Sequence, residues 1–503
     1  MSVVAGVDSS TQSCTVTLHD TVTGDLLGQG RARHPGTTPP RSEQHPEDWW
    51  TAFATAFRDA CEDAGRKAAE VDALSFAAQY HGLVVLDAEG RVLRAAKLWN
   101  DTTSHAQAER LVRELGPQAW AERVGSVPTA AFTITKLAWL RDHEPDVYRR
   151  VASVMVPHDW LGAQLTGEHV TDRVDASGTG YFDAVANRWR PDVLQWVDQR
   201  DDWEDLLPRV AGPSEPAGLA VTARAQELGL RRDAVVACGT GDQAAAALAL
   251  GVQDGDVVIS LGTSGTVYGS STAPVRDVRG LVNVTANARG GFQPIAVLLN
   301  AAKVTDTFCR LLGVGHDEMA TLALAADPAE RNRPVLVAYL DGERSPNRPR
   351  ARGMLAGLSS GTSREGLALS VFEGVALGLL AGHQGLVDIG TATGGRLLLA
   401  GGASRSPAYR TVVARVFGKD VQAPAGDGSL DVARGAAVQA STVAQGRVID
   451  DVVADWRLPA RTVATADPAL TERAHELRAL HARAAQITAL DGAWDDEPVV
   501  PAP

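Results

Sequence analysis

The sequence predicts a protein of alternating strands and helices in which one arrangement occurs twice. At 503 residues the chain is too long for a single hydrophobic core, and its length predicts two or three domains. A β-type run at Val3–Val7 leads into a turn of small hydroxyl residues and a second strand, and Asp256–Ser260 leads into a similar turn far downstream. When Asp8 is aligned with Gly262, the two hairpins are separated by about half the length of the chain. This spacing indicates an internal duplication.

Composition narrows the class of protein. Hydrophobic residues make up 45% of the chain and charged residues 22%, which is typical of a soluble globular protein. A net charge of −13, without a run of Lys and Arg, argues against nucleic acid as a partner. No stretch reads as long and apolar enough to span a bilayer, and the four cysteines show neither disulfide nor metal spacing. We therefore expect a cytoplasmic protein without a membrane partner.

In the first half of the chain, polar and aromatic residues follow predicted strands. The residues Gln79–Gly82 follow one strand, and Trp99–Asp101 follow the next. Such groups at strand ends are typical of a small polyol site, although a single His or Trp there is more often structural. Asp172 and Asp175 are interpreted as loop carboxylates rather than ligands of a hydroxyl. The predicted elements are the strand Cys14–Leu18, a helix that follows from Gln44–Trp50 and runs to about Ala64, the strand Val71–Ala77, a hairpin of Leu83–Leu86 with Val92–Leu98, and the helix Phe132–His143.

The stretch Ala234–Gly251 is the centre of the prediction. A short apolar run ends at Gly239-Thr240-Gly241, and Asp242 then precedes an alanine-rich helix. A strand-to-helix turn of this kind presents free amides and a positive dipole end to an anion. Asp242 either caps this helix or accepts a proton from a hydroxyl that attacks a bound phosphate. The stretch alone leaves both interpretations open.

The second half repeats the pattern of strand, glycine turn and helix. The strand Arg396–Ala400 turns at Gly401-Gly402-Ala403-Ser404, and such glycines let a flat ring lie against the backbone, although a single Gly-Gly is a weak signal. Arg209–Gly218 is predicted to be a surface connection, and the end of the chain to be frayed. The other predicted elements are the strand Val335–Leu340 and the helices Ser363–Leu380, Tyr409–Phe417, Val432–Val443 and Pro468–Ile487.

The order of these motifs resembles the FGGY family of carbohydrate kinases over nearly the whole chain. Gln-x-His-Gly, Leu-Trp-Asn-Asp and Gly-Glu-Arg-Ser-Pro are most similar to the motifs of members that act on D-xylulose, rather than on glycerol or gluconate. The motifs in chain order are Asp8–Thr11, Glu43–Trp50, Gln79–Gly82, Leu98–Asp101, Phe132–Trp139, Gly239–Ala244, Ser260–Gly265, Gly342–Pro346, Gly353–Glu373 and Ala400–Ser404.

The resemblance implies an α/β, actin-like ATPase fold, in which two ribonuclease-H-like domains flank a nucleotide and sugar cleft. It implies a sugar and phosphate domain at 1–245, a nucleotide domain at 246–450 and a helical tail at 451–503. The implied reaction uses ATP and Mg²⁺ to convert a small sugar, D-xylulose, to D-xylulose 5-phosphate, and a homodimer fits the family. The alternatives are a kinase for ribulose, glycerol or gluconate, and a sugar or nucleotide sensor without activity.

The resemblance also assigns roles to residues. Asp242 corresponds to the catalytic base and Asp8 to the acid near the metal. Ser10 stands where members usually have Gly, and Thr15 where they usually have Lys or Arg; these departures keep the sensor as an alternative, and the presence of Asp242 weighs against it. The implied substrate-binding residues are Gln79, Tyr80, His81, Gly82, Trp99, Asn100, Asp101 and Asp242. The implied nucleotide-binding residues are Ser10, Thr11, Gln12, Gly262, Thr263, Ser264, Gly401, Gly402, Ala403 and Ser404.

Overall fold

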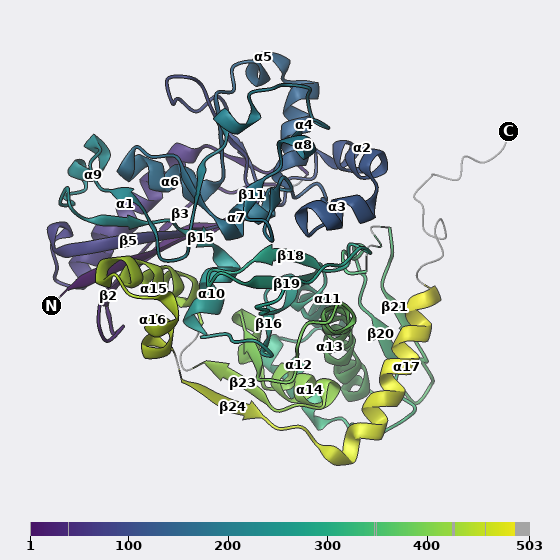
Figure 1. The fold of residues 1–503 in the computed structure, drawn as a ribbon. Coiled ribbons are helices and arrows are strands. Elements are labelled where there is room, and N and C mark those ends of the chain that lie inside the picture. The colour runs from purple at the N-terminus through teal and green to yellow at the C-terminus, as the bar shows by residue number, and fades with distance from the viewer. Residues whose placement is uncertain are drawn as a thin grey trace. The chain divides into compact units, whose positions relative to one another are not determined.

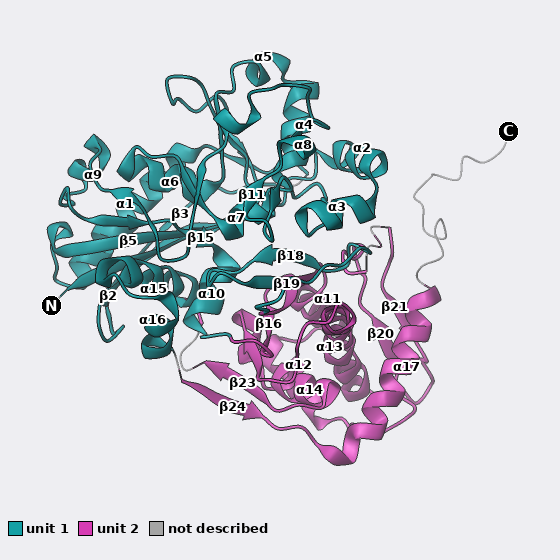
Figure 2. Cartoon of the chain, viewed as in Figure 1, with its two compact units in different colours: residues 1–252, 271–293, 430–458 teal, residues 253–270, 294–429, 459–503 magenta. Residues whose placement is uncertain are grey.

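The computed structural model describes residues 2–38, 40–346, 348, 350–424, 428–457 and 459–487. The chain forms two compact units, drawn in different colours in Figure 2. Unit 1 comprises residues 1–252, 271–293 and 430–458, and unit 2 comprises 253–270, 294–429 and 459–503. Neither unit is therefore one continuous segment. The division at residues 245 and 450 that the family resemblance implies stays a prediction.

Unit 1 is built on a mixed sheet with the strand order β13-β14-β5-β1-β2-β3 (Figure 1). The central strand β1 is antiparallel to β2 and parallel to β5, and β15 pairs with the end of β5. The strands are β1 (Val3–Ser9), β2 (Ser13–Asp20), β3 (Leu26–Arg33), β5 (Val71–Ala78), β13 (Pro216–Leu219), β14 (Val235–Ala237) and β15 (Thr240–Gly241).

Unit 2 contains a sheet of the same topology. Its order β19-β17-β16-β22-β23-β24 repeats the pairing pattern of unit 1 strand by strand, with β16 in the place of β1. The predicted duplication is thus confirmed. The strands are β16 (Val257–Leu261), β17 (Gly265–Gly269), β19 (Phe292–Leu298), β22 (Leu397–Ala400), β23 (Val421–Pro424) and β24 (Ala460–Ala464).

The register of the two hairpins corrects the predicted alignment. The last pair before the first turn is Ser9 with Cys14, and the last pair before the second turn is Leu261 with Gly265. Ser9 therefore corresponds to Leu261, and the counterpart of Asp8 is Ser260. The prediction that placed Asp8 opposite Gly262 is wrong, because the similarity of the turns alone does not fix the pairing register.

Helices cover both faces of the unit 1 sheet. On one face, α1 (Pro46–Asp63) buries aromatic side chains against the core, and on the other α15 (Asp431–Gln445) lies directly on β1. A Cβ at Gly6 would stand 1.9 Å from Ala433 O, so the backbones of β1 and α15 are in contact. The helix α10 (Asp242–Ala249) packs equally closely on α15, because a Cβ at Gly435 would stand 1.7 Å from Ala245 O. These contacts fix the start of α10 beside the sheet.

The other elements of unit 1 correct two predictions. The strand β6 (Val84–Leu86) pairs with β8 (Ser153–Met155), and β7 (Ala96–Lys97) pairs with β4 (Glu43–Gln44), so the predicted hairpin is reduced to two isolated antiparallel bridges, Leu83 with Lys97 and Leu86 with Val92. The predicted connection at 209–218 contains β12 (Arg209–Ala211) and the start of β13. Both errors arise because these strands pair with partners distant in sequence. The remaining elements are α2 (His105–Leu115), α3 (Pro117–Val124), α4 (Thr133–His143), α5 (Pro145–Tyr148), α6 (Pro157–Thr166), β9 (Val170–Asp172), α7 (Arg173–Gly178), β10 (Phe182–Asp183), β11 (Arg188–Trp189), α8 (Pro191–Leu194), α9 (Ala223–Glu227), β18 (Asn283–Ala286), α16 (Ile449–Trp456) and the 3₁₀ turns Ala68–Glu70 and Trp203–Leu206.

In unit 2 the helix α13 (Arg364–Asp388) corrects the prediction that no stretch is long and apolar enough to span a bilayer. This helix is long and apolar enough to cross a membrane by length and composition, with a mean hydropathy of 1.5, but 72% of that apolar window is buried. Its Glu373 accepts two hydrogen bonds from the buried Arg333 guanidinium. We interpret α13 as a core helix. The remaining elements are α11 (Ala302–Leu312), α12 (His316–Ala325), β20 (Val335–Val337), β21 (Met354–Ala356), α14 (Pro407–Phe417), α17 (Thr471–Ile487) and the 3₁₀ turns Gly402–Arg405 and Pro468–Leu470; the end of the chain lies outside the described residues.

Candidate active site

Asp242 is the first residue of α10, and Gly241 takes the N-cap position. The Asp242 side chain does not cap the helix across a turn; its Oδ1 accepts a hydrogen bond from the next amide, Gln243 N, at 2.7 Å. Burial, and then the charge of Asp8, raise the pKa of Asp242 to about 7. A carboxylate with such a pKa can exchange a proton near neutral pH.

Asp8 is the second carboxylate of this site and lies near the end of β1. Burial raises its pKa to about 7, while a hydrogen bond from Ser10 and the charge of Arg31 act in the opposite direction. Within the described residues, the buried Asp8 Oδ1 has no hydrogen-bond partner. Two neighbouring, partly buried carboxylates repel each other, so a divalent cation with oxygen ligands fits at this position.

The hydroxyl turn between β1 and β2 is joined to residues of the predicted sugar site. Trp99 Nε1 donates to Thr11 Oγ1 at 2.9 Å, and Thr11 Oγ1 donates to Gln79 Oε1 at 3.3 Å. Gln44 Nε2 holds the turn by donating to Thr11 O at 2.9 Å, and Trp49 Nε1 fixes Gln44 in turn. Gln44 was not singled out from the sequence, although it lies in the motif Glu43–Trp50.

The turn itself has a compact backbone. Ser10 N donates to Ser13 O at 3.1 Å, and His34 N donates to Gln12 O at 2.9 Å. The ring of His34 lies against the same turn, since its Nδ1 is 2.9 Å from Ser10 O. The predicted residues Ser10, Thr11 and Gln12 are thus held in one fixed conformation.

Tyr80 and His81 follow β5 and are held from several sides. The Tyr80 ring lies on Gly241, where a Cβ would stand 2.2 Å from Tyr80 Cζ. Burial, followed by the charges of Asp175 and Asp242, holds the pKa of Tyr80 well above its ordinary value, so the phenol stays neutral. His81 has φ of +65°, an uncommon conformation for a residue other than glycine, and its ring stacks on Phe132.

Both the backbone carbonyl and the ring of His81 form hydrogen bonds. His81 O accepts hydrogen bonds from Thr133 Oγ1 at 3.2 Å and Lys136 Nζ at 3.0 Å, and His81 Nδ1 lies 2.6 Å from Gly178 O. Gly82 packs on Pro157, where a Cβ would stand 2.6 Å from Pro157 Cγ. The backbone is therefore held in its strained conformation by α4, α6 and α7.

Asp101 and Asn100 differ in their surroundings. Asp101 is fully buried, with Lys97 Nζ 3.2 Å from both of its oxygens and Ser42 N 2.9 Å from Oδ2. Lys97 also lies 3.9 Å over the Trp139 ring. The Asp101 oxygens are thus occupied by protein groups, which position the loop that presents Trp99 and Asn100. Within the described residues, the buried Asn100 Oδ1 has no hydrogen-bond partner.

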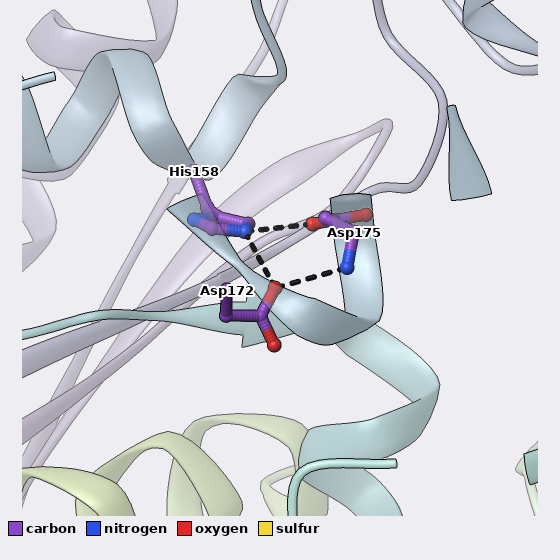
Figure 3. Close-up of side chains that lie close together, drawn as sticks. All are labelled: His158, Asp172 and Asp175. Carbon is purple, nitrogen blue, oxygen red and sulfur yellow. Dashed lines mark hydrogen bonds and ion pairs between the residues drawn. The ribbon is translucent and has the colours of Figure 1, made fainter. Parts of the chain in front are cut away.

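Figure 3 shows a buried cluster of His158, Asp172 and Asp175 in unit 1. The charges of Asp175 and Asp172 act on the Tyr80 phenol. His158 Nε2 is 3.0 Å from Asp175 Oδ2 and 3.3 Å from Asp172 Oδ1, and Asp172 caps α7 by accepting from Asp175 N at 2.9 Å. The interpretation of the two aspartates as loop carboxylates is wrong, since Asp172 ends β9 and caps α7, Asp175 lies within α7, and both are buried.

Charge determines the state of this cluster. Burial acts to lower the pKa of His158. The carboxylates of Asp159 and Asp175 nevertheless hold this pKa well above its ordinary value. The three side chains also have the spacing of metal ligands. A protonated imidazole already supplies the positive charge that the carboxylates need. His158 was not singled out from the sequence, because its partners come from elements later in the chain.

In unit 2 the predicted nucleotide-binding residues come together. Gly401 has φ of +85°, and a Cβ there would stand 2.6 Å from Leu261 O, so its turn lies against the end of β16. Ala302 N at the start of α11 donates to Gly262 O at 3.0 Å. The turn that contains Gly262, Thr263 and Ser264 thus lies beside the turn that contains Gly401, Gly402, Ala403 and Ser404.

Comparison with known proteins defines the class of protein to which this fold and site belong. The sequence models of the N-terminal and C-terminal domains of the FGGY family of carbohydrate kinases match residues 3–249 and 257–444. The chain belongs to this family. It is 41% identical to "Xylulose kinase" of Streptomyces rubiginosus over 92% of both chains.

Solved structures have the same fold. A crystal structure of xylulose kinase from Bifidobacterium adolescentis matches with a TM-score of 0.83 and 35% identity, covering 96% of this chain and 99% of that one. Plasmodium falciparum glycerol kinase with ADP matches with a TM-score of 0.85, 17% identity and coverage of 97% and 98%, which shows the fold alone. The α/β, actin-like fold and the carbohydrate kinase class expected from the sequence are confirmed.

Proposed function

We propose that this protein transfers the terminal phosphoryl group of ATP to the primary hydroxyl of D-xylulose and forms D-xylulose 5-phosphate. One observation supports this substrate above the other polyols: relatives named xylulose kinase share up to 41% identity along nearly the whole chain. We also propose that the protein is cytoplasmic, which fits its four free cysteines. We further propose that it forms a homodimer.

In the proposed mechanism, Asp242 orients the attacking hydroxyl and accepts its proton. Its pKa of about 7 suits this step, because the carboxylate is largely ionised at slightly alkaline pH and still basic enough to take the proton. The proton moves late, as the phosphoryl group reaches the acceptor oxygen. The neutral Tyr80 phenol and the protonated His158 limit the repulsion that Asp175 adds next to Asp242.

Asp8 would hold Mg²⁺, partly through water, and the ion would neutralise charge on the phosphate oxygens when bound. The unpartnered Asp8 Oδ1 supports this assignment. The backbone amides of the turns at Thr11 and Thr263 would bind phosphate oxygens, since glycine- and hydroxyl-rich turns present their N–H groups to anions. The turn at Gly401 and Gly402 would take the adenosine.

The sugar would bind to polar groups of unit 1 that follow β5 and β7. Trp99 is 37% exposed and presents an apolar ring face, while its indole N–H is fixed on Thr11. Asn100 and Gln79 supply side-chain amides, and His81 supplies a ring held at a fixed angle. Asp101 would act by holding the loop, because its own oxygens are taken.

The test is sugar-dependent ADP release from Mg-ATP, with D-xylulose, D-ribulose, glycerol and gluconate at equal concentrations. We expect kcat/KM to be highest for D-xylulose by at least about 10-fold, as expected when a site hydrogen-bonds each substrate hydroxyl. Higher kcat/KM for another sugar would replace the substrate but keep the class. Absence of sugar-dependent ADP release with every sugar would favour the sensor.

A further inference from the structure

Arg31 on β3 lies in one row with Asp8. The register pairs Asp8 with Thr15 across β1 and β2, and Thr15 with Arg31 across β2 and β3. Directly opposite residues in a sheet present their side chains on the same face. Arg31 therefore shares a face with the Asp8 carboxylate, and Thr15 between them carries no charge.

The Arg31 side chain reaches towards the hydroxyl turn. Its Nε and Nη2 donate to Ser13 Oγ at 3.2 and 3.1 Å, and Ser13 itself is buried. An arginine has five N–H donors, and one hydroxyl oxygen occupies only two of them. Within the part of the chain that the structure describes, Arg31 forms no ion pair, so the remaining donors are available to an anion.

The charge of Arg31 acts on the carboxylates of the site. It opposes the effect of burial on the pKa of Asp8, as a cation close to that carboxylate does. Asp8 in turn raises the pKa of Asp242. A triphosphate bound at the turn between β1 and β2 would meet both carboxylates, and a guanidinium on the same face offsets this repulsion.

We infer that Arg31 is a catalytic residue that binds the phosphates of the nucleotide at the turn Ser10–Ser13 and stabilises the charge that develops on the transferred group. This inference rests on the proposed function. The guanidinium is held by Ser13 in advance, and such preorganised donors act on the transition state more than on the free substrate. Bidentate donation to phosphate oxygens is the usual mode for arginine.

The first experiment measures Arg31→Ala. We expect kcat/KM for Mg-ATP to fall by about 100-fold, the effect of losing one preorganised donor, and KM for D-xylulose to change less than about 2-fold. The affinity for adenosine, which lacks phosphates, stays at the wild-type value. The matched control is Arg33→Ala, which removes an equal charge from the same exposed strand edge and has a small effect.

The second experiment restores a cation from the neighbouring strand. Thr15→Lys in the Arg31→Ala background places an ammonium on the same row, and we expect it to recover kcat/KM for Mg-ATP at least about 10-fold. A purely structural role for Arg31 would not be rescued in this way, and the Tm values of all variants should agree.

Three results would overturn the inference. These are wild-type kcat/KM for Mg-ATP in Arg31→Ala, an equal loss in Arg33→Ala, or no recovery by Thr15→Lys in a protein with the wild-type Tm. If the wild type releases no ADP with any sugar, the proposed function fails. The affinity of Arg31→Ala for Mg-ATP then tests the inference separately: a loss relative to wild type supports it, and wild-type affinity overturns it.

Discussion

The two sheets of this protein have the same topology but carry different chemistry. In unit 1 the first strand carries Asp8 next to its last residue, and the strand beside it leads into Gln79, Tyr80 and His81. In unit 2 the position of Asp8 is taken by Ser260, and the strand beside it leads into a turn of glycine, alanine and serine that begins at Gly401.

This difference separates two tasks that a kinase must perform. The two neighbouring carboxylates whose pKa values are raised to about 7, Asp8 and Asp242, both lie in unit 1. The turns of unit 2 instead offer backbone amides and space without side chains, since nothing lies within 4 Å of a Cβ at Gly402. By our proposal, one duplicated scaffold thus supports acid–base chemistry in one copy and nucleotide binding in the other.

The largest expected effect comes from removing the base. Asp242→Asn keeps the size of the side chain and the hydrogen bond to Gln243 N, but it cannot accept the proton. We expect kcat/KM for D-xylulose to fall by about 10³-fold or more. Glu62→Gln on the exposed side of α1 is the matched control and should retain wild-type activity. Activity of Asp242→Asn within about 10-fold of wild type would contradict the assignment.

The same variant has a second consequence, for stability. Because the folded protein holds the pKa of Asp242 at about 7, against 3.8 for a free side chain, the ionised form is disfavoured by folding. This group therefore stabilises the fold most below about pH 4, and that contribution is lost as the pH rises to about 7. Asp242→Asn should be more stable than wild type by about 1 kcal/mol or more at pH 8, and the difference should shrink below pH 4.

A smaller effect is expected when unit 1 is made like unit 2. Asp8→Ser replaces the acid by the residue at the equivalent position of the other sheet and removes the oxygen that we assign to Mg²⁺. We expect kcat to fall by about 100-fold, and half-saturation to need more Mg²⁺. An Mg²⁺ titration of ADP release measures both. An unchanged Mg²⁺ requirement would show that Asp8 does not hold the ion.

A still smaller effect is expected in unit 2. In Gly401→Ala the methyl group meets the backbone of Leu261 at a φ of +85°, which costs about 1–3 kcal/mol and displaces the turn. KM for ATP should rise by about 10-fold, and KM for D-xylulose should stay the same, because the sugar groups lie in unit 1. The matched control is Gly394→Ala, where a Cβ meets nothing within 4 Å. Equal changes in both KM values would contradict the separation of tasks.

Much of the fold could be predicted from the sequence because the relevant signals are local. The strands β1 and β5, the helix α1 and the glycine turns before α10 all have patterns that stand within one short segment. Pairings between distant segments could not be predicted in this way. The partnership of β6 with β8, and the strand β12 beside β9, depend on packing that no local pattern reveals.

The residues of the candidate site likewise fall into those with a local sequence signal and those that only the folded chain reveals. The sequence could single out Asp8, Asp242 and Thr11, because Asp8 and Thr11 stand where a predicted strand gives way to a turn and Asp242 opens a predicted helix. It did not reveal that Asp101 is bonded to Lys97, that His158 meets two aspartates, or that Arg31 shares a row with Asp8. These facts depend on contacts and registers that only the folded chain defines.

The measurement that tests the account most directly is the pH dependence of kcat/KM for D-xylulose in wild type and in Asp8→Asn. For wild type we predict an acidic limb with a midpoint near pH 7, where Asp242 gains its proton. Because the charge of Asp8 raises the pKa of Asp242, Asp8→Asn should move this limb to lower pH while lowering the rate. A limb that stays in place when Asp8 is neutralised, or a wild-type profile that is flat from pH 5 to 8, would contradict the claim that Asp242 accepts the proton.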